Sequence, residues 1–147
     1  MRKKELTKEQ QVKFKWLMKA DTKNEDVKVS KFGGLIWEDG IWKNGTWEYG
    51  IWKGGTWEGG TWEGGTWKDG FWEDGIRKNG VWKGGYWEDG TWEGGTWKDG
   101  FWESGFWEGG IWKGGTWEGG FMWSNLEQKY IKVKWDKDKR EFEEDLK

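Results

Sequence analysis

The chain has 147 residues, a net charge of −2 at neutral pH, 27 glycines and 19 tryptophans, and it contains neither cysteine nor histidine. The length suits one domain, but a hydrophobic content of 33% is unlike that of an ordinary globular core, so tryptophan must supply most of the buried surface. The absence of cysteine and histidine excludes disulfides, thiol nucleophiles and the usual zinc sites, and it removes histidine acid–base chemistry.

No apolar run approaches the roughly 18–20 residues that span a membrane, and the basic residues 1–4 lead into a charged segment rather than an apolar one. We therefore expect no signal peptide, no transmembrane segment and no membrane partner. The expected location is cytoplasmic or virion-associated.

Three segments differ in charge. Basic residues exceed acidic ones by five in residues 1–35, acidic residues exceed basic ones by seven in residues 36–120, and the two balance in residues 121–147. An acidic body with a basic head is a poor match to counterion-release binding, so nucleic acid is not an expected partner. The same boundaries define an N-terminal helix and capping segment, a repeat array and a C-terminal cap.

Residues 7–20 are predicted to form a helix of about three turns. Thr7-x-x-Gln10 is a capping box, in which the two side chains satisfy backbone donors reciprocally. The helix would cover the open first coil of the repeat, and binding to a membrane surface is the less common alternative. The apolar residues of its buried face are Val12, Trp16, Leu17 and Ala20. Residues 21–26 read as a polar linker, residues 27–32 alternate like a half-buried strand, and Gly33-Gly34 forms a turn.

Residues 36–120 consist of 17 consecutive copies of a five-residue unit. In every copy the fifth residue is Gly and the third is Glu or Lys, while the second is Trp in 16 of 17 copies, the exception being Arg77. One architecture for this array is a meander, in which Asp-Gly, Asn-Gly and Gly-Gly form hairpin turns between three-residue strands. That arrangement would leave every indole on one uncovered face, far more apolar surface than a monomer normally exposes.

The second architecture is a solenoid, in which each unit forms one side of a coil. The array resembles the pentapeptide-repeat family in period and polarity over about 85 of the 147 residues. The resemblance implies an all-β, right-handed, four-sided β-solenoid of about 20 residues per coil, with Gly40 at the small inward position and Trp42 at the large one. Ile41, Lys43 and Asn44 would then face outward. Similar Gly-x-Trp-x-x arrays occur in uncharacterised phage and bacterial proteins.

The order of Glu and Lys at position three provides an independent test of coil length. A coil of 20 residues gives 13 vertical pairs, of which nine are opposite in sign, whereas a coil of 15 residues gives 14 pairs, of which ten are alike. Like charges about 4.8 Å apart in neighbouring strands are destabilising. The charges therefore favour the 20-residue coil, and the evident 15-residue periodicity is interpreted as duplication history.

The array ends at residue 121, where Met122 takes the tryptophan position and Trp123 falls one place late. Residues 129–135 alternate, with Ile131, Val133 and Trp135 on one face, and are predicted to form a strand that covers the last coil. Residues 136–147 are expected to be a short helix or a frayed tail, because Phe142 and Leu146 are four residues apart.

Four features of the array are candidate sites. Arg77 opens a polar gap in the core, or stacks its guanidinium on Trp57 and Trp97, its neighbours in a 20-residue coil, or reflects sequence drift within the repeat, which is the commonest of the three cases. Rows of outward threonine can order ice, but the expected column of Thr56, Thr96 and Thr116 includes Ile76. Glu73 and Asp74 resemble a carboxylate pair but have no predicted pocket. The outward aromatic residues that could form an adhesive patch for a partner are Phe71, Tyr86, Phe101 and Phe106.

These observations favour a non-enzymatic structural or protein-interaction module, such as a phage structural or accessory protein, with a protein partner or self-assembly. No catalytic residue, cofactor or metal site is expected, and the sequence does not indicate whether a small molecule binds. An alternative implied by the family resemblance is an acidic DNA mimic that inhibits a DNA-binding enzyme. A carbohydrate- or ice-binding surface is a more distant alternative.

Overall fold

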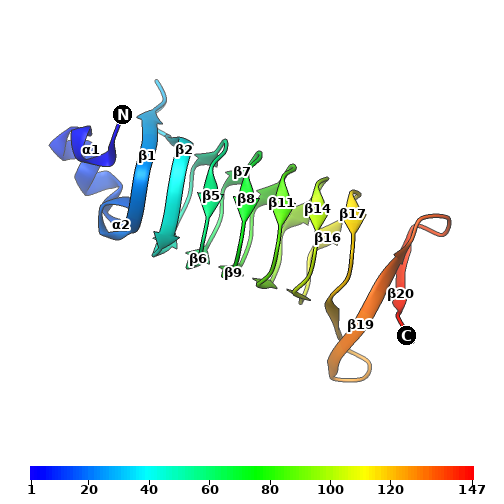
Figure 1. The fold of residues 1–147 in the computed structure, drawn as a ribbon. Coiled ribbons are helices and arrows are strands. Elements are labelled where there is room, and N and C mark those ends of the chain that lie inside the picture. Colours follow the sequence, from blue (N-terminus) through cyan, green and yellow to red (C-terminus); the bar gives the residue numbers. More distant parts are fainter.

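A computed structural model describes residues 1–147 as an elongated stack of short-stranded coils, with helices at the N-terminal end and a β-hairpin at the C-terminal end (Figure 1). The array is thus a β-solenoid, as predicted. The alternative meander is wrong, because each strand pairs in parallel with the strand that lies fifteen residues further along the sequence. None of the helices combines the length and apolar content needed to cross a membrane.

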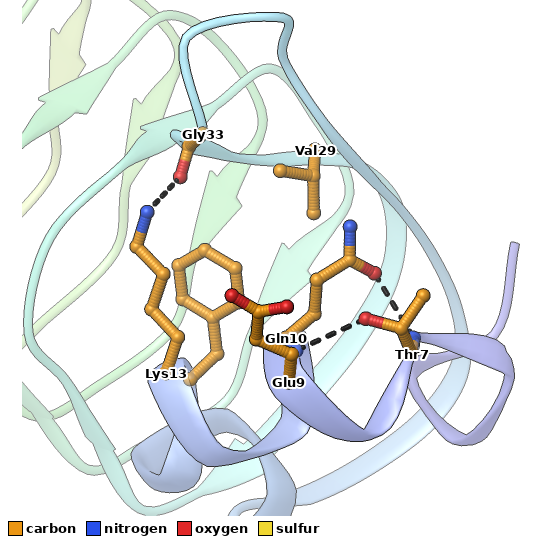
Figure 2. A pocket seen from close by; sticks show the side chains of 7 residues that line it. Thr7, Glu9, Gln10, Lys13, Val29 and Gly33 are labelled. Atoms are coloured by element: carbon orange, nitrogen blue, oxygen red, sulfur yellow. Dashed lines mark hydrogen bonds between the residues drawn. The ribbon is translucent and has the colours of Figure 1, made fainter.

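The N-terminal cap consists of the 3-10 helix η1 (Lys3–Glu5) and two helices, α1 (Lys8–Lys13) and α2 (Lys15–Lys19). The predicted capping box is confirmed: the Gln10 N–H donates to Thr7 Oγ1 at 3.1 Å, and the Thr7 N–H donates to Gln10 Oε1 at 3.0 Å (Figure 2). The predicted single helix is interrupted at Phe14, whose φ of −104° and ψ of 46° are not helical.

The break at Phe14 changes which side chains are buried. Val12, expected on the buried face, is 77% exposed, whereas Phe14 is fully buried. Trp16 lies 5.0 Å from Trp47 of the first coil, ring centroid to ring centroid. The cap therefore covers the first coil as predicted, but through α2 and Phe14 rather than through one continuous stripe.

Strand β1 (Asp21–Val29) runs antiparallel to β2 (Leu35–Asn44). Residues 21–26 are thus part of a strand, and their assignment as a linker is wrong. The predicted strand at 27–32 ends at Val29, and Gly33, with a φ of +83°, lies in the turn as expected. Because β1 pairs along the edge of the first coil, its polar residues are held by backbone pairing, with only Glu25 and Val27 buried.

After β2, each unit of the array contributes one short strand, and these strands form three sides. Strand β2 begins both side 1 and side 2. Side 1 continues with β4 (Ile51–Trp52), β7 (Thr66–Trp67), β10 (Val81–Trp82), β13 (Thr96–Trp97) and β16 (Ile111–Trp112). Side 2 continues with β5 (Thr56–Trp57), β8 (Phe71–Trp72), β11 (Tyr86–Trp87), β14 (Phe101–Trp102) and β17 (Thr116–Trp117). Side 3 consists of β3 (Thr46–Trp47), β6 (Thr61–Trp62), β9 (Ile76–Arg77), β12 (Thr91–Trp92), β15 (Phe106–Trp107) and β18 (Phe121–Ser124).

The coil has three sides and 15 residues, so the predicted four-sided coil of about 20 residues is wrong. Trp42 pairs with Trp57, where a 20-residue coil would place Trp62. In the first coil the three indoles of Trp37, Trp42 and Trp47 contact one another pairwise, with centroids 5.9, 5.8 and 6.5 Å apart. Three large rings therefore close the cross-section without a fourth.

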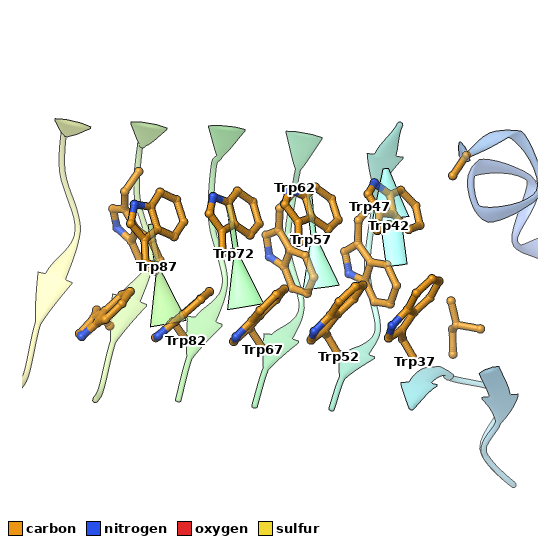
Figure 3. Close-up of a cluster of buried hydrophobic side chains, with 14 of the residues drawn as sticks. Trp37, Trp42, Trp47, Trp52, Trp57, Trp62, Trp67, Trp72, Trp82 and Trp87 are labelled. Carbon is orange, nitrogen blue, oxygen red and sulfur yellow. The ribbon is translucent and has the colours of Figure 1, made fainter. Parts of the chain in front are cut away.

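Successive indoles of one side also stack on each other, except on side 3, where Arg77 separates Trp62 from Trp92. Trp37 and Trp52 lie 4.7 Å apart with planes 7° from parallel, and the same arrangement continues along the array (Figure 3). An aromatic pair contributes about 0.5–1.5 kcal/mol beyond its burial, whereas a pair of surface charges across strands contributes about 0.2–1 kcal/mol. The charge pattern pointed to the wrong coil because the indole packing outweighs it.

The fifth-position glycines form the corners of the coil. Gly85 has a φ of +108°, and a Cβ added to it would lie 2.5 Å from the carbonyl oxygen of Gly70 in the preceding coil. Gly40, expected to be a small inward residue, also has a positive φ, and its added Cβ would lie 2.6 Å from the Cα of Glu25. Glycine is thus required by corner conformation and coil-to-coil contact, not by interior volume.

The C-terminal cap is a hairpin of β19 (Lys129–Asp136) and β20 (Glu141–Glu144), joined to side 3 through β18. The predicted strand is confirmed, and its inward residues pack against the end of the core. The Trp117 indole N–H donates to the Val133 carbonyl at 3.1 Å, and Phe142 lies 4.8 Å from Trp117. Residues 141–144 form a strand instead of the expected helix or tail, because they pair with β19.

Candidate interaction surface

The outer surface of the solenoid is organised in columns. In each unit the second residue points into the core, so the first and third residues face outward on either side of it. Backbone hydrogen bonds hold successive coils in register, as where the Tyr86 N–H donates to the Gly70 carbonyl at 2.9 Å. Equivalent residues fifteen positions apart therefore form straight columns with a spacing of about 4.8 Å.

An aromatic column lies on side 2. Tyr86 stacks between Phe71 and Phe101, with ring centroids 4.8 and 5.0 Å away and planes within 7° of parallel. The Tyr86 hydroxyl donates to Glu103 Oε2 at 2.7 Å, and this hydrogen bond is the main reason that the pKa of Tyr86 is raised to about 12. Three of the four aromatic residues predicted for a partner surface are thus brought together.

The fourth predicted residue, Phe106, lies on side 3 and does not belong to that column. It stacks on Phe121 at 5.4 Å and meets the ring of Tyr130 edge to face at 4.8 Å. The Tyr130 hydroxyl donates to Glu108, and this bond raises the pKa of Tyr130 to about 12. Phe106 is therefore part of the junction between the last coils and the C-terminal hairpin.

Side 1 carries a column of positive charge, the lysine column. Lys53 lies 3.6 Å from Glu38, which also pairs with Lys28 at 2.7 Å. Asp69 and Asp99 follow two of the lysines at the corner, so this outer region has a net charge of +3, from five lysines and two aspartates. The members of the lysine column are Lys53, Lys68, Lys83, Lys98 and Lys113.

Side 2 carries a matching column of negative charge, the glutamate column. Glu73 lies between Glu58 and Glu88 in this column, and burial together with the charges of those two neighbours raises its pKa. Asp74 and Asp89 at the corner bring this outer region to a net charge of −7, from five glutamates and two aspartates. The members of the glutamate column are Glu58, Glu73, Glu88, Glu103 and Glu118.

Arg77 lies in the core, fully buried, in the position of an indole. Its guanidinium carbon is 4.7 Å from the ring of Trp62 and 4.8 Å from that of Trp92. The predicted stacking is therefore confirmed in kind, but the partners are the side 3 neighbours instead of Trp57 and Trp97. No hydrogen bond is made by its guanidinium nitrogens, and desolvation holds the pKa well below its ordinary value.

The remaining predicted features are separated by the three-sided coil. Thr56 and Thr116 lie on side 2 with the aromatic column between them, whereas Thr96 lies on side 1, so the expected threonine column does not form. The Asp74 carboxylate accepts a 2.8 Å hydrogen bond from the Gly75 N–H at the corner. Asp74 thus serves the local turn, while Glu73 belongs to the glutamate column.

Comparison with protein-family models, curated proteins and solved structures found no match for this chain. The fold and surface themselves define the class: a repeat protein with a tryptophan-cored, three-sided β-solenoid. The lysine and glutamate columns were not identified as a surface from the sequence, although the signal was present. Reading position three at intervals of fifteen residues produces both columns directly.

Proposed function

We propose that the chain is a non-enzymatic, rigid module that binds another protein, or assembles with itself, through its outer surface. The observation that carries this proposal is the column of Phe71, Tyr86 and Phe101 beside the glutamate column on side 2. Aromatic side chains are enriched at the energetic centres of protein interfaces, because they bury a large area at a low cost in side-chain entropy.

The packing of the core indicates that the side 2 surface is rigid. Each indole is held by parallel stacking along its side and by edge-to-face contacts with the adjacent sides, as for Trp57 with Trp72 at 4.8 Å and with Trp62 at 6.0 Å. Both ends of the stack are covered, by α2 and by the β19–β20 hairpin. A solenoid packed in this way holds its surface columns in fixed positions, so few side chains would have to be ordered when a partner binds.

The setting that we propose is a phage or bacterial structural or accessory assembly, with the protein in the cytoplasm or the virion. The five-residue unit supports a relationship to pentapeptide-repeat proteins, although the coil closes after three units. Incorporation of the chain into purified virions or a native higher-order complex, detected by mass spectrometry, tests this setting. Its absence from every such assembly in the native source would contradict it.

The interaction role is tested by capture from the native source with the immobilised full chain. We expect a specific protein to bind the wild type and to bind a Phe71→Ser/Tyr86→Ser/Phe101→Ser variant at least about tenfold more weakly, since buried aromatic anchors contribute about 2 kcal/mol or more. Ile76→Ser on side 3 is the matched control for an outward apolar residue. Equal binding by all three proteins would remove side 2 as the recognition surface.

A second candidate function is DNA mimicry, favoured by the glutamate column and the adjacent Asp74 and Asp89. A straight acidic surface can compete with the DNA phosphate backbone for a basic groove. This function predicts a complex with a DNA-processing enzyme that weakens steeply as salt is raised and that duplex DNA displaces. Binding that is insensitive to both would favour the aromatic column and the scaffold role.

A further inference from the structure

Sides 1 and 2 have complementary surfaces. On side 1 the lysine column runs beside an apolar column of Ile51, Val81 and Ile111 that is interrupted by Thr66 and Thr96, and on side 2 the glutamate column runs beside the aromatic column, which Thr56 and Thr116 flank. We propose that side 1 of one copy docks on side 2 of a second copy, with the two solenoid axes antiparallel. This inference deepens the proposed interaction role and rests on it, by identifying a second copy of this chain as an occupant of side 2.

The order of the columns determines the orientation. The chain crosses every side in the same rotational sense, so on each side the apolar column precedes the charged column. If two sides face each other with parallel axes, the apolar column of each lies opposite the charged column of the other. Turning one copy end over end places the two apolar columns opposite each other and the two charged columns opposite each other. Val81 then faces Tyr86, while the threonine methyl groups of Thr66 and Thr96 face Phe101 and Phe71. Burial of apolar groups against each other and of opposite charges in pairs favours this antiparallel arrangement.

The register follows from the equal lengths of the two columns. At the centre, Lys83 lies opposite Glu88 and Val81 lies opposite Tyr86 of the other copy. At the ends, Lys53 lies opposite Glu118, and Lys113 opposite Glu58. Both columns have the same spacing of about 4.8 Å because both are set by the same backbone ladder, so all five charge pairs can form together.

The alternative self-contacts are electrostatically unfavourable. Side 1 docked on a second side 1 in the same antiparallel manner would oppose lysine with lysine, and side 2 on side 2 would oppose glutamate with glutamate. Like charges placed opposite each other in an interface cost several kcal/mol. Only the pairing of side 1 with side 2 places the +3 and −7 regions in contact.

Within one chain, each of the two columns is a stack of like charges that repel one another. Docking of a second copy would reduce this repulsion in both columns. Burial is the main cause of the raised pKa of Glu73, and the charges of Glu58 and Glu88 raise it further, as expected for neighbouring like charges. Of the lysine column, Lys53 alone is within ion-pair distance of a carboxylate in its own chain, at 3.6 Å from Glu38. An opposing column of the other sign converts these repulsions into attractions at the same positions.

This contact uses different surfaces of the two copies, so each docked copy still has one free side 1 or side 2. A contact of this kind extends into open assemblies unless the rotation happens to close a ring. The faces are narrow, with two columns each, so we expect a weak interface of the transient class that depends on concentration and salt.

The test is sedimentation velocity of the full chain from about micromolar to about millimolar concentration, at low and high salt. We expect the wild type to associate at low salt and to dissociate at high salt. Lys83→Glu alone, or Glu88→Lys alone, should weaken association about tenfold or more. An equimolar mixture of the two variants should recover it, because in an alternating assembly every central contact then joins opposite charges.

Matched controls lie on side 3. Lys78→Glu and Glu63→Lys change the net charge by the same amounts and should leave association within about twofold of the wild type, since small surface changes away from an interface cost little. Circular dichroism and tryptophan fluorescence establish that each variant is folded. Equal loss of association in the side 3 variants would mean that net charge, and not docking of sides 1 and 2, controls assembly.

Orientation is tested by cross-linking, for which the cysteine-free chain has no background. In a mixture of Ile51→Cys and Thr116→Cys, which lie at opposite ends of the array, a short bismaleimide should join the two proteins. A mixture of Ile51→Cys and Thr56→Cys, which lie at the same end, should cross-link at least about tenfold less, because end-to-end reversal separates those positions by four coil spacings, about 19 Å. Preferential joining of the second mixture would overturn the antiparallel arrangement.

A protein that stays monomeric at every concentration and salt, or a mixture of the charge-reversed variants that fails to recover association, would overturn the docking of a second copy. Capture of a native partner that depends on the aromatic column would still support the proposed function in that case. Failure of both experiments would remove the interaction role itself, so the two failures are distinguishable.

Discussion

The guanidinium carbon of Arg77 lies 4.7 Å from the ring centroid of Trp62, in a position where side 3 otherwise has an indole. The contact replaces aromatic stacking with a cation–π interaction, which contributes about 2 kcal/mol or more when desolvated. The guanidinium is fully buried, and none of its nitrogens makes a hydrogen bond. Burial of an unpaired charge costs several kcal/mol, so the contact offsets only part of that cost.

Arg77→Trp is therefore expected to raise the free energy of unfolding by about 1–4 kcal/mol, because it restores the indole stack and removes the buried charge. Arg77→Lys should lower it by about 1–3 kcal/mol, since an ammonium is more strongly hydrated and cannot stack as a plane. Reversible denaturant unfolding measures both. A less stable Arg77→Trp protein would show that the guanidinium is preferred in this position.

Two adjacent glycines test the origin of the corner. Gly85→Ala should destabilise the fold by more than about 2 kcal/mol, because alanine at a φ of +108° is strained and its Cβ would lie 2.5 Å from the Gly70 carbonyl oxygen. The added Cβ at Gly84 would lie 3.5 Å from the Lys68 carbonyl oxygen, an ordinary contact. Gly84→Ala is thus the control and should be neutral or stabilising by up to about 1 kcal/mol. Similar thermal midpoints for the two variants would contradict the assigned corner.

The hydrogen bond from Tyr86 to Glu103 raises the pKa of Tyr86 to about 12. Glu103→Gln should lower that pKa toward the ordinary tyrosine value, because the neutral amide removes a charge that opposes the phenolate. Absorbance of tyrosinate as a function of pH, measured as the difference from the wild type, detects the change. Glu88→Gln removes a charge that is not hydrogen-bonded to Tyr86 and should have a smaller effect. Equal shifts in the two variants would argue against the hydrogen bond.

Repulsion in the glutamate column makes stability depend on salt and pH. Burial, together with the charges of Glu58 and Glu88, raises the pKa of Glu73 in the folded state, so its ionisation costs stability at neutral pH, and this cost disappears as the pH falls through the raised pKa. Glu73→Gln should therefore stabilise the protein at pH 7 by about 0.2–1 kcal/mol, with a smaller gain at high salt. Glu63→Gln, whose column contains Glu48 and Lys78, is the control with neighbours of mixed sign. A gain from Glu73→Gln that persists at acidic pH would contradict the electrostatic cause.

Burial of the array predicts how its fluorescence responds to aqueous quenchers. The indoles from Trp37 to Trp102 are fully buried, whereas Trp123 is 37% exposed. Most of the emission should resist iodide in the native state and become quenchable on unfolding. Trp123→Phe should reduce the native quenchable fraction, and Trp57→Phe should not. Ready quenching of the whole native signal would indicate open coils.

Much of the fold follows from short-range patterns. The five-residue period places an indole at the same position in 16 of 17 units, and burial of those indoles implies a coil. The Thr7–Gln10 capping box and the alternation of residues 129–135 are local signals, and the structure confirms both. The aromatic column was partly predictable for the same reason, since outward positions are defined by the inward tryptophan.

The number of sides depends on contacts that no local pattern contains. Charge pairing at the surface favours four sides, but mutual contact of Trp37, Trp42 and Trp47 closes three. This error also misplaced the neighbours of Arg77 and separated the lysines into different columns. The strand at residues 21–26 was missed because its polar residues are ordered by pairing with β2, a partner elsewhere in the sequence.

The fifteen-residue coil gives the molecule a fixed increment of length. Inserting or deleting one coil changes the rod by about 4.8 Å and leaves every later side chain on its own side. Inserting a single five-residue unit has a different result, since it moves every later residue by one side and places the later lysines of side 1 after the earlier glutamates on side 2. Selection that preserves the columns would therefore change the length of this protein only in steps of fifteen residues, which is one coil.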